Sequence, residues 1–152
     1  MLLDRQNEFS TAQLLTVSAI STDQIDTLAG NSFTNLVQNL GGTPGALYLI
    51  VQTRGTFAGG TSLQFSLESD SVNTLAASPT VHFISQVFPV AQLTANRTLA
   101  VIPLPYGDYE KFLGMRYTIV GTMSGAGSVI QAFLVSDAQV WKAYPVAQAS
   151  NL

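Results

Sequence analysis

The strongest constraint on the fold of this chain is a two-residue alternation of apolar and polar side chains in short segments. In residues 63–68 (Leu-Gln-Phe-Ser-Leu-Glu) the alternation predicts a strand with its two leucines and its phenylalanine facing a core. Residues 47–52 and 129–135 are apolar on both faces, as in strands at the centre of a sandwich. Further strands are expected at residues 14–20, 25–28, 81–87, 98–102 and 115–122.

Glycine and proline separate these segments. Gly59-Gly60 and residues 124–127 (Ser-Gly-Ala-Gly) supply positive φ angles, so the runs flanking each are expected to form hairpins. Apolar residues at 33, 36, 37 and 40, between Ser32 and Gly41, predict one short helix. We therefore predict an all-β protein, a jelly-roll type β-sandwich of about eight strands with at most one short helix. A single domain is expected over residues 1–152, with flexible or docking arms at 1–10 and 143–152.

Charged residues make up 10% of the 152 residues, well below the roughly 25% of ordinary soluble domains. The net charge is −3 and the six lysines and arginines are scattered, so the basic cluster of a nucleic-acid-binding protein is missing. No apolar run approaches the ~18 residues of a membrane span, and no secretion signal precedes the first strand. We expect a chain that stays in the compartment where it is made and is buried in an oligomer or larger complex.

Groups suited to catalysis or metal binding are sparse. The chain has one histidine, His82, and no cysteine, which excludes zinc–thiolate and iron–sulfur sites and favours a structural histidine. Glu68 and Asp70 share one face of a predicted strand end. We interpret them as solvating a turn, although an opposite carboxylate would make calcium binding or acid–base chemistry possible. Asp108 and Glu110 are interpreted as loop charges, and we expect no enzyme activity, metal or cofactor.

Aromatic side chains gather in the connection after residue 103. Tyr106, Tyr109 and Phe112 follow two stiff prolines, where such rings either anchor a binding surface or fold over the edge of their own sheet. The sequence leaves both possibilities open. Trp141 near Tyr144 presents a similar choice between a sugar-stacking platform and a lid over the core, and here we favour the lid.

Several short segments resemble one protein family, the capsid cement, or decoration, proteins of short-tailed bacteriophages of the Bordetella phage type. They keep the family's order over nearly the whole chain, from an N-terminal signature through a proline loop to a late hairpin. The segments that carry the resemblance are residues 3–10 (Leu-Asp-Arg-Gln-Asn-Glu-Phe-Ser), 12–13, 21–22, 26, 102–105 (Ile-Pro-Leu-Pro), 111–117 (Lys-Phe-Leu-Gly-Met-Arg-Tyr), 120–122, 127–128, 133–135 and 137–139.

The resemblance implies a jelly-roll homodimer that binds the major capsid protein on the outside of an icosahedral head. There it would cement neighbouring subunits against the pressure of packaged DNA, as a virion component made in the host cytoplasm, without catalytic residues or cofactor. An alternative is a carbohydrate-binding jelly-roll module, which the resemblance would assign to a phage particle, with an exposed coplanar aromatic pair from Trp141 or from Tyr106 and Tyr109. The candidate partner-contact residues are Leu3, Arg5, Phe9, Tyr106, Tyr109, Phe112, Trp141 and Tyr144.

Overall fold

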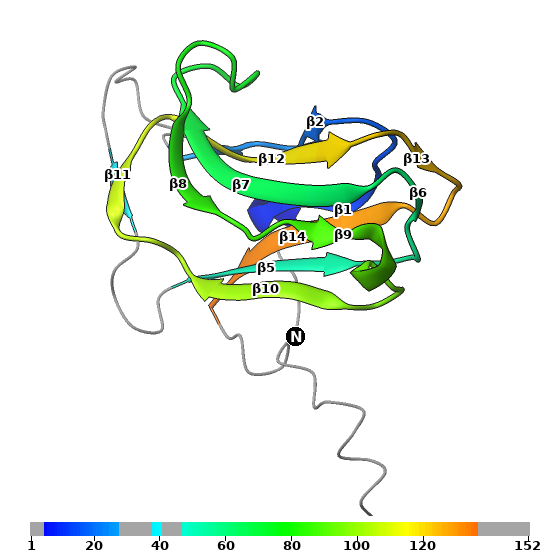
Figure 1. Cartoon of the computed structure of the whole chain (residues 1–152). Coiled ribbons are helices and arrows are strands. Elements are labelled where there is room, and N and C mark those ends of the chain that lie inside the picture. The colour runs from blue at the N-terminus through cyan, green and yellow to red at the C-terminus, as the bar shows by residue number, and fades with distance from the viewer. Residues whose placement is uncertain (1–4, 28–37, 41–46, 137–152) are drawn as a thin grey trace, which may run out of the picture.

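The computed structural model describes residues 5–27, 38–40 and 47–136, the part of the chain coloured in Figure 1. Strands dominate this part, with two short 3-10 turns, η1 and η2. The elements, in order, are η1 (Arg5–Asn7), β1 (Glu8–Leu14), β2 (Ala19–Ile20), β3 (Ile25–Asp26), β4 (Gln38–Leu40), β5 (Tyr48–Thr53), β6 (Ala58–Gly59), β7 (Ser62–Asp70), β8 (Thr80–Ile84), β9 (Phe88–Pro89), η2 (Val90–Gln92), β10 (Thr98–Pro103), β11 (Gly107–Tyr109), β12 (Phe112–Val120), β13 (Met123–Ser124) and β14 (Val129–Val135).

Two antiparallel sheets form the layers of a sandwich (Figure 1). One has the order β1-β14-β5-β10, and the other has the order β2-β12-β7-β8, with β3 and β9 added as short extensions. If these eight strands are numbered along the chain, the orders become 1-8-3-6 and 2-7-4-5, so that most successive strands alternate between the sheets as in a jelly roll. The predicted all-β sandwich of about eight strands is therefore confirmed.

The core lies between the two sheets. The predicted alternation in β7 is confirmed, because Leu63, Phe65 and Leu67 are all buried and join the main apolar cluster. β12 pairs with β7 over nine positions and adds buried side chains to the same layer. Burial of each such large apolar side chain stabilises the fold by roughly 1.5–3 kcal/mol. The residues that β12, β5 and β14 contribute are Leu113, Met115, Tyr117, Ile119, Leu49, Val51, Ile130, Ala132 and Leu134.

β5 and β14 are apolar on both faces, as their sequences predicted. On the face turned away from the main core, Ile50 and Phe133 are fully buried in a second, smaller cluster with Val135. Tyr48 and Val101 pack against this cluster. The outer side of the four-stranded sheet therefore also carries a cluster of buried apolar side chains.

The first strand was expected at residues 14–20, and this is wrong. β1 is Glu8–Leu14, so residues 8–10, which were expected in an N-terminal arm, belong to a sheet. Ser10 is fully buried there, and its Oγ lies 2.7 Å from the hydroxyl oxygen of Tyr117, a core residue 107 positions away. That distant partner satisfies a polar group that the local sequence pattern alone would place in solvent.

The two glycine-rich segments turn as expected, but they do not close hairpins. Gly59, Gly60 and Gly125 have φ angles of 69°, 61° and 97°, which glycine adopts without strain. The strands that flank them, β5 with β7 and β12 with β14, lie in different sheets. The turns instead carry the chain between layers, and β6 pairs with β13 as a two-stranded ribbon.

The helix expected at residues 33–40 is contradicted at its C-terminal end. β4 (Gln38–Leu40) is a strand that pairs with β11 (Gly107–Tyr109), so nonlocal backbone hydrogen bonds replace the helical ones there. The residues before Gln38 in that prediction, and the C-terminal arm at 143–152, lie outside the described residues.

Candidate functional site

The aromatic loop, residues 103–112, has one exposed ring and two rings that pack against the protein. Tyr106 is 72% exposed, whereas Tyr109 is fully buried, with its hydroxyl donating to the Pro105 carbonyl at 2.5 Å. Phe112 is half-buried, and the Lys111 ammonium lies 5.0 Å from its ring centroid. Tyr106 and Tyr109 therefore do not form the exposed coplanar pair that stacking on sugar rings would need.

Tyr109 is held in place by the histidine. The His82 and Tyr109 rings are stacked, with centroids 4.0 Å apart, and His82 Nε2 lies 2.7 Å from Ser69 Oγ. Burial lowers the pKa of His82, although the charge of Glu110 acts in the opposite direction. Burial also raises the pKa of Tyr109 to about 12. His82 is thus a hydrogen-bonded structural residue, as the sequence indicated.

Two further candidate contact residues lie in the described N-terminal elements, Arg5 in η1 and Phe9 in β1. Arg5 is exposed in η1, and Phe9 is fully buried in the main core, so its ring offers no surface to a partner. Leu3, Trp141 and Tyr144 lie outside the described residues.

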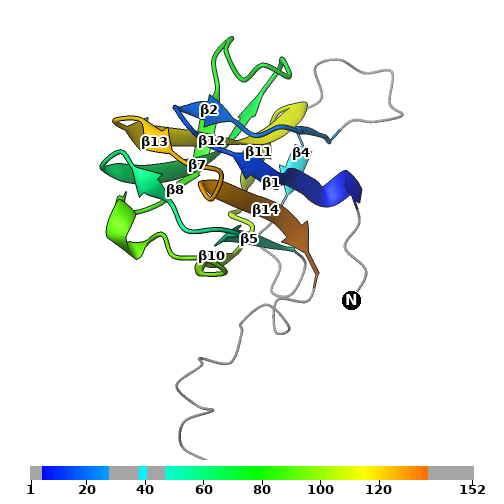
Figure 2. The same ribbon diagram turned by 90° about the vertical axis from the view of Figure 1, so that its right-hand side faces the viewer.

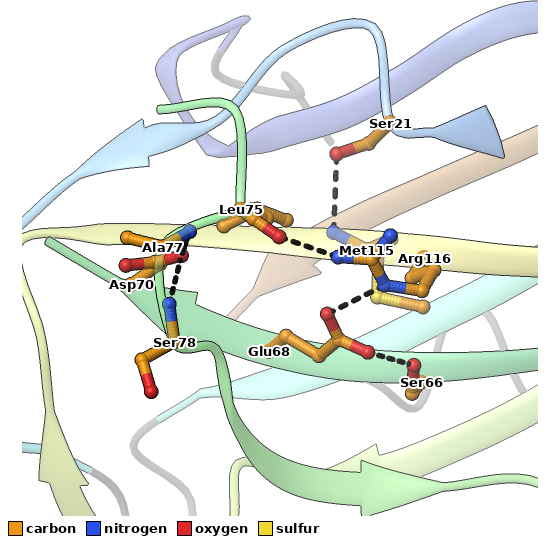
Figure 3. Close-up of polar contacts among 9 residues, drawn as sticks. All are labelled: Ser21, Ser66, Glu68, Asp70, Leu75, Ala77, Ser78, Met115 and Arg116. Carbon is orange, nitrogen blue, oxygen red and sulfur yellow. Dashed lines mark hydrogen bonds and ion pairs between the residues drawn. The ribbon is translucent and has the colours of Figure 1, made fainter. Parts of the chain in front are cut away.

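An ion pair between a buried carboxylate and a partly exposed arginine occupies the outer face of the six-stranded sheet (Figure 3). Arg116 Nε donates to Glu68 Oε2 at 2.8 Å, and Ser66 Oγ donates to Oε1 at 2.7 Å. The Glu68 side chain is 5% exposed and that of Arg116 is 36% exposed. Glu68 therefore does not solvate a turn, as its sequence position had suggested, but fixes an arginine across the β7–β12 pair.

The arginine in turn fixes the loop between β7 and β8, which rises above the sheet in Figure 1. Arg116 Nη2 donates to the Leu75 carbonyl at 2.6 Å. Leu75 has a φ of 50° and is fully buried. A Cβ placed on Gly114 would lie 2.8 Å from Leu75 Cδ1, so the glycine leaves the space that the leucine fills.

Asp70, the last residue of β7, organises the same loop. Its Oδ2 accepts hydrogen bonds from the backbone N–H groups of Ala77 at 2.9 Å and Ser78 at 3.3 Å (Figure 3). Burial by itself would raise the pKa of Asp70, but the backbone hydrogen bonds outweigh it and hold the pKa below its ordinary value. The carboxylates of Glu68 and Asp70 are thus both engaged in holding the fold.

Sequence reasoning missed Arg116 and Leu75 as partners of this network. One signal for Arg116 was available, since it lies between Met115 and Tyr117 and so faces away from the core. Within the described ranges, no group of three or more histidine, aspartate or glutamate side chains is placed to hold a metal ion. What these residues do, in the geometry seen here, is brace a loop against a sheet.

A protein-family model, Bbp16, matches residues 9–134, which spans the sandwich from β1 to β14. The chain belongs to the Bbp16 family. Bbp16 is a family of Bordetella phage proteins, so the resemblance to a Bordetella phage protein is confirmed. No curated protein matches the sequence.

Membership in the Bbp16 family and the all-β sandwich both fit a structural protein of a phage particle. The aromatic loop and the braced β7–β8 loop lie within the matched residues. Across residues 5–27, 38–40 and 47–136, no helix is long and apolar enough to cross a membrane.

Proposed function

We propose that this Bbp16 chain is a capsid cement protein. It binds the outside of the icosahedral phage head and joins neighbouring major capsid subunits, which stabilises the head against the pressure of packaged DNA. The observation that carries the proposal is the family match over residues 9–134, together with the resemblance of the N-terminal and proline-loop segments to cement proteins of this phage type.

The physical character of the surface supports such a role. A cement protein acts by burying area across subunit boundaries, and it needs no titratable chemistry to do so. With 10% charged residues, the chain loses little charge solvation when its surface is covered. Large side chains such as Tyr106, Ile84 and Val120 are exposed although they are apolar or aromatic, and such exposure favours contact with another protein.

We propose in addition that the chain works as a homodimer whose partner is the major capsid protein, without enzyme activity and without nucleic acid or membrane as partner. A dimer that binds two sites on one head raises its apparent affinity by effective concentration, so weak individual contacts suffice.

The proposal is tested by co-sedimentation of the purified protein with DNA-free, expanded heads of its own phage that lack it. The proposal predicts saturable binding at a fixed number of copies per major capsid subunit. Binding that does not saturate, or no binding, would contradict it. In that case an array of glycans would test the carbohydrate-binding alternative.

A further inference from the structure

One end of the sandwich is built from segments without a single charged residue. These segments, which we call the neutral end, are residues 14–18, 55–61, 87–96 and 120–127, and Figure 2 looks onto them. Backbone hydrogen bonds tie the segments to one another. The bonds run from Met123 N–H to the Thr16 carbonyl at 2.8 Å, from Phe57 N–H to the Leu93 carbonyl at 2.9 Å, from Thr61 N–H to the Val120 carbonyl at 2.8 Å and from Val90 N–H to the Thr61 carbonyl at 3.0 Å.

The neutral end exposes apolar side chains. Leu14, Val17, Val87 and Val120 are 53–56% exposed, and each comes from a turn or strand end of this region. A Cβ placed on Gly125 would meet no atom within 4 Å, so the turn beside them also leaves its backbone open to close approach. Such a surface can be covered without removing any charge from water.

Charge is distributed unequally along the long axis of the sandwich. Arg54, just after β5, and Arg97, just before β10, are exposed beside the neutral end and give its margin a positive charge. At the opposite end, around β11 in Figure 1, three acidic residues and one lysine lie in β3, in β11 and between β11 and β12, and the lysine ammonium lies 4.0 Å from the β3 carboxylate. These residues are Asp26, Asp108, Glu110 and Lys111.

We propose that the neutral end is the surface that contacts the major capsid protein, and that the capsid surface it meets is apolar with carboxylates opposite Arg54 and Arg97. This inference rests on the proposed function and names the surface that performs it. The acidic end would then point away from the contact, where its charge keeps the decorated particle soluble.

Charge complementarity argues against a second copy of the chain as the occupant of the neutral end. A two-fold contact sets the same patch against itself, so both copies would bring only arginines, Arg54 and Arg97, to its margin, with no carboxylate of the patch to pair with them. Joining the neutral end of one copy to the acidic end of the next would be complementary, but it would build an open chain rather than a closed dimer. A different protein with acidic positions avoids both problems.

The test compares two valines of equal exposure in the co-sedimentation assay. Val120 on the neutral end is 56% exposed and Val81 on β8 is 54% exposed. We expect Val120→Asp to weaken binding to heads that lack the protein by about tenfold or more, and Val81→Asp to change it by less than about twofold. Val120→Asp should unfold close to the wild-type temperature, because the replaced side chain faces solvent. Val81→Asp sets a carboxylate opposite Glu68 in the β7–β8 pairing and should unfold at a somewhat lower temperature.

Two charge-reversal variants provide a second binding test that does not depend on the aspartate variants folding well. Arg54→Glu should weaken binding about fivefold or more and reduce its sensitivity to salt, whereas Lys111→Glu, the same charge change at the acidic end, should not. If the wild type binds and the neutral-end variants bind equally well, the inference is overturned and the proposed function stands. The same holds if the control variants lose as much affinity as the neutral-end variants. Failure of the wild type to bind would overturn the proposed function, and this inference with it.

Discussion

Arg116→Met is expected to destabilise the fold by about 3 kcal/mol. Removing one partner of a buried ion pair typically costs about 3–5 kcal/mol, because the other charge stays buried without compensation. The Arg116 side chain is 36% exposed, so water screens the pair and we take the lower end of that range. This value includes the lost hydrogen bond to the Leu75 carbonyl. For a chain of this length it corresponds to a fall in Tm of about 6–12 °C.

The assay is urea and thermal unfolding of a double-mutant cycle with Glu68→Leu. The double variant should be less destabilised than the sum of the single variants, with a coupling energy of about 1–3 kcal/mol, because removing both charges leaves none buried alone. Arg54→Met, at an exposed arginine, serves as the control and should stay within about 0.5 kcal/mol of wild type. A coupling energy near zero, or equal effects of the two arginine variants, would refute the reasoning.

Three other changes test separate parts of the structure. Gly114→Ala should destabilise by about 1–3 kcal/mol in chemical unfolding, because its Cβ would overlap Leu75, which is already held at a φ of 50°; wild-type stability would contradict the packing described. The folded-state pKa of Asp70 is lowered, so its contribution to stability is complete above the unfolded-state pKa of about 3.9 and is lost as pH falls through the folded-state value. Asp70→Asn should therefore lie below wild type at pH 7, and the gap should narrow below about pH 4; a gap independent of pH would show that the carboxylate charge is not what holds the loop. Tyr109→Phe should cost about 1 kcal/mol through the lost hydrogen bond, while Tyr106→Ser should leave Tm nearly unchanged; the reverse order would show that the packing of the two rings is assigned wrongly.

The sequence could predict the two-sheet architecture because local apolar patterns indicate which face of each strand is buried. The alternation in β7 and the apolar runs of β5 and β14 depend on which face of a strand is buried, and that pattern needs no knowledge of the partner strand. Positive φ at Gly59 and Gly125 is likewise a property of the residue itself.

The buried polar contacts could not be predicted in the same way, because their partners lie far along the chain. Ser10 is buried against Tyr117, and Glu68 against Arg116, at separations of 107 and 48 residues. A local pattern assigns such polar residues to solvent or to a turn. Leu75 is a similar case, since a leucine in a polar loop becomes buried only because Gly114 leaves room for it.

The most direct measurement of the cement role is the temperature at which DNA-filled heads of this phage release their DNA, with and without the protein bound to saturation. The account predicts a clear rise in that temperature on addition of the wild-type chain to heads that lack it, and a smaller rise with Val120→Asp at the same concentration. An unchanged release temperature at full occupancy would show that the protein decorates the head without reinforcing it, and would contradict the account.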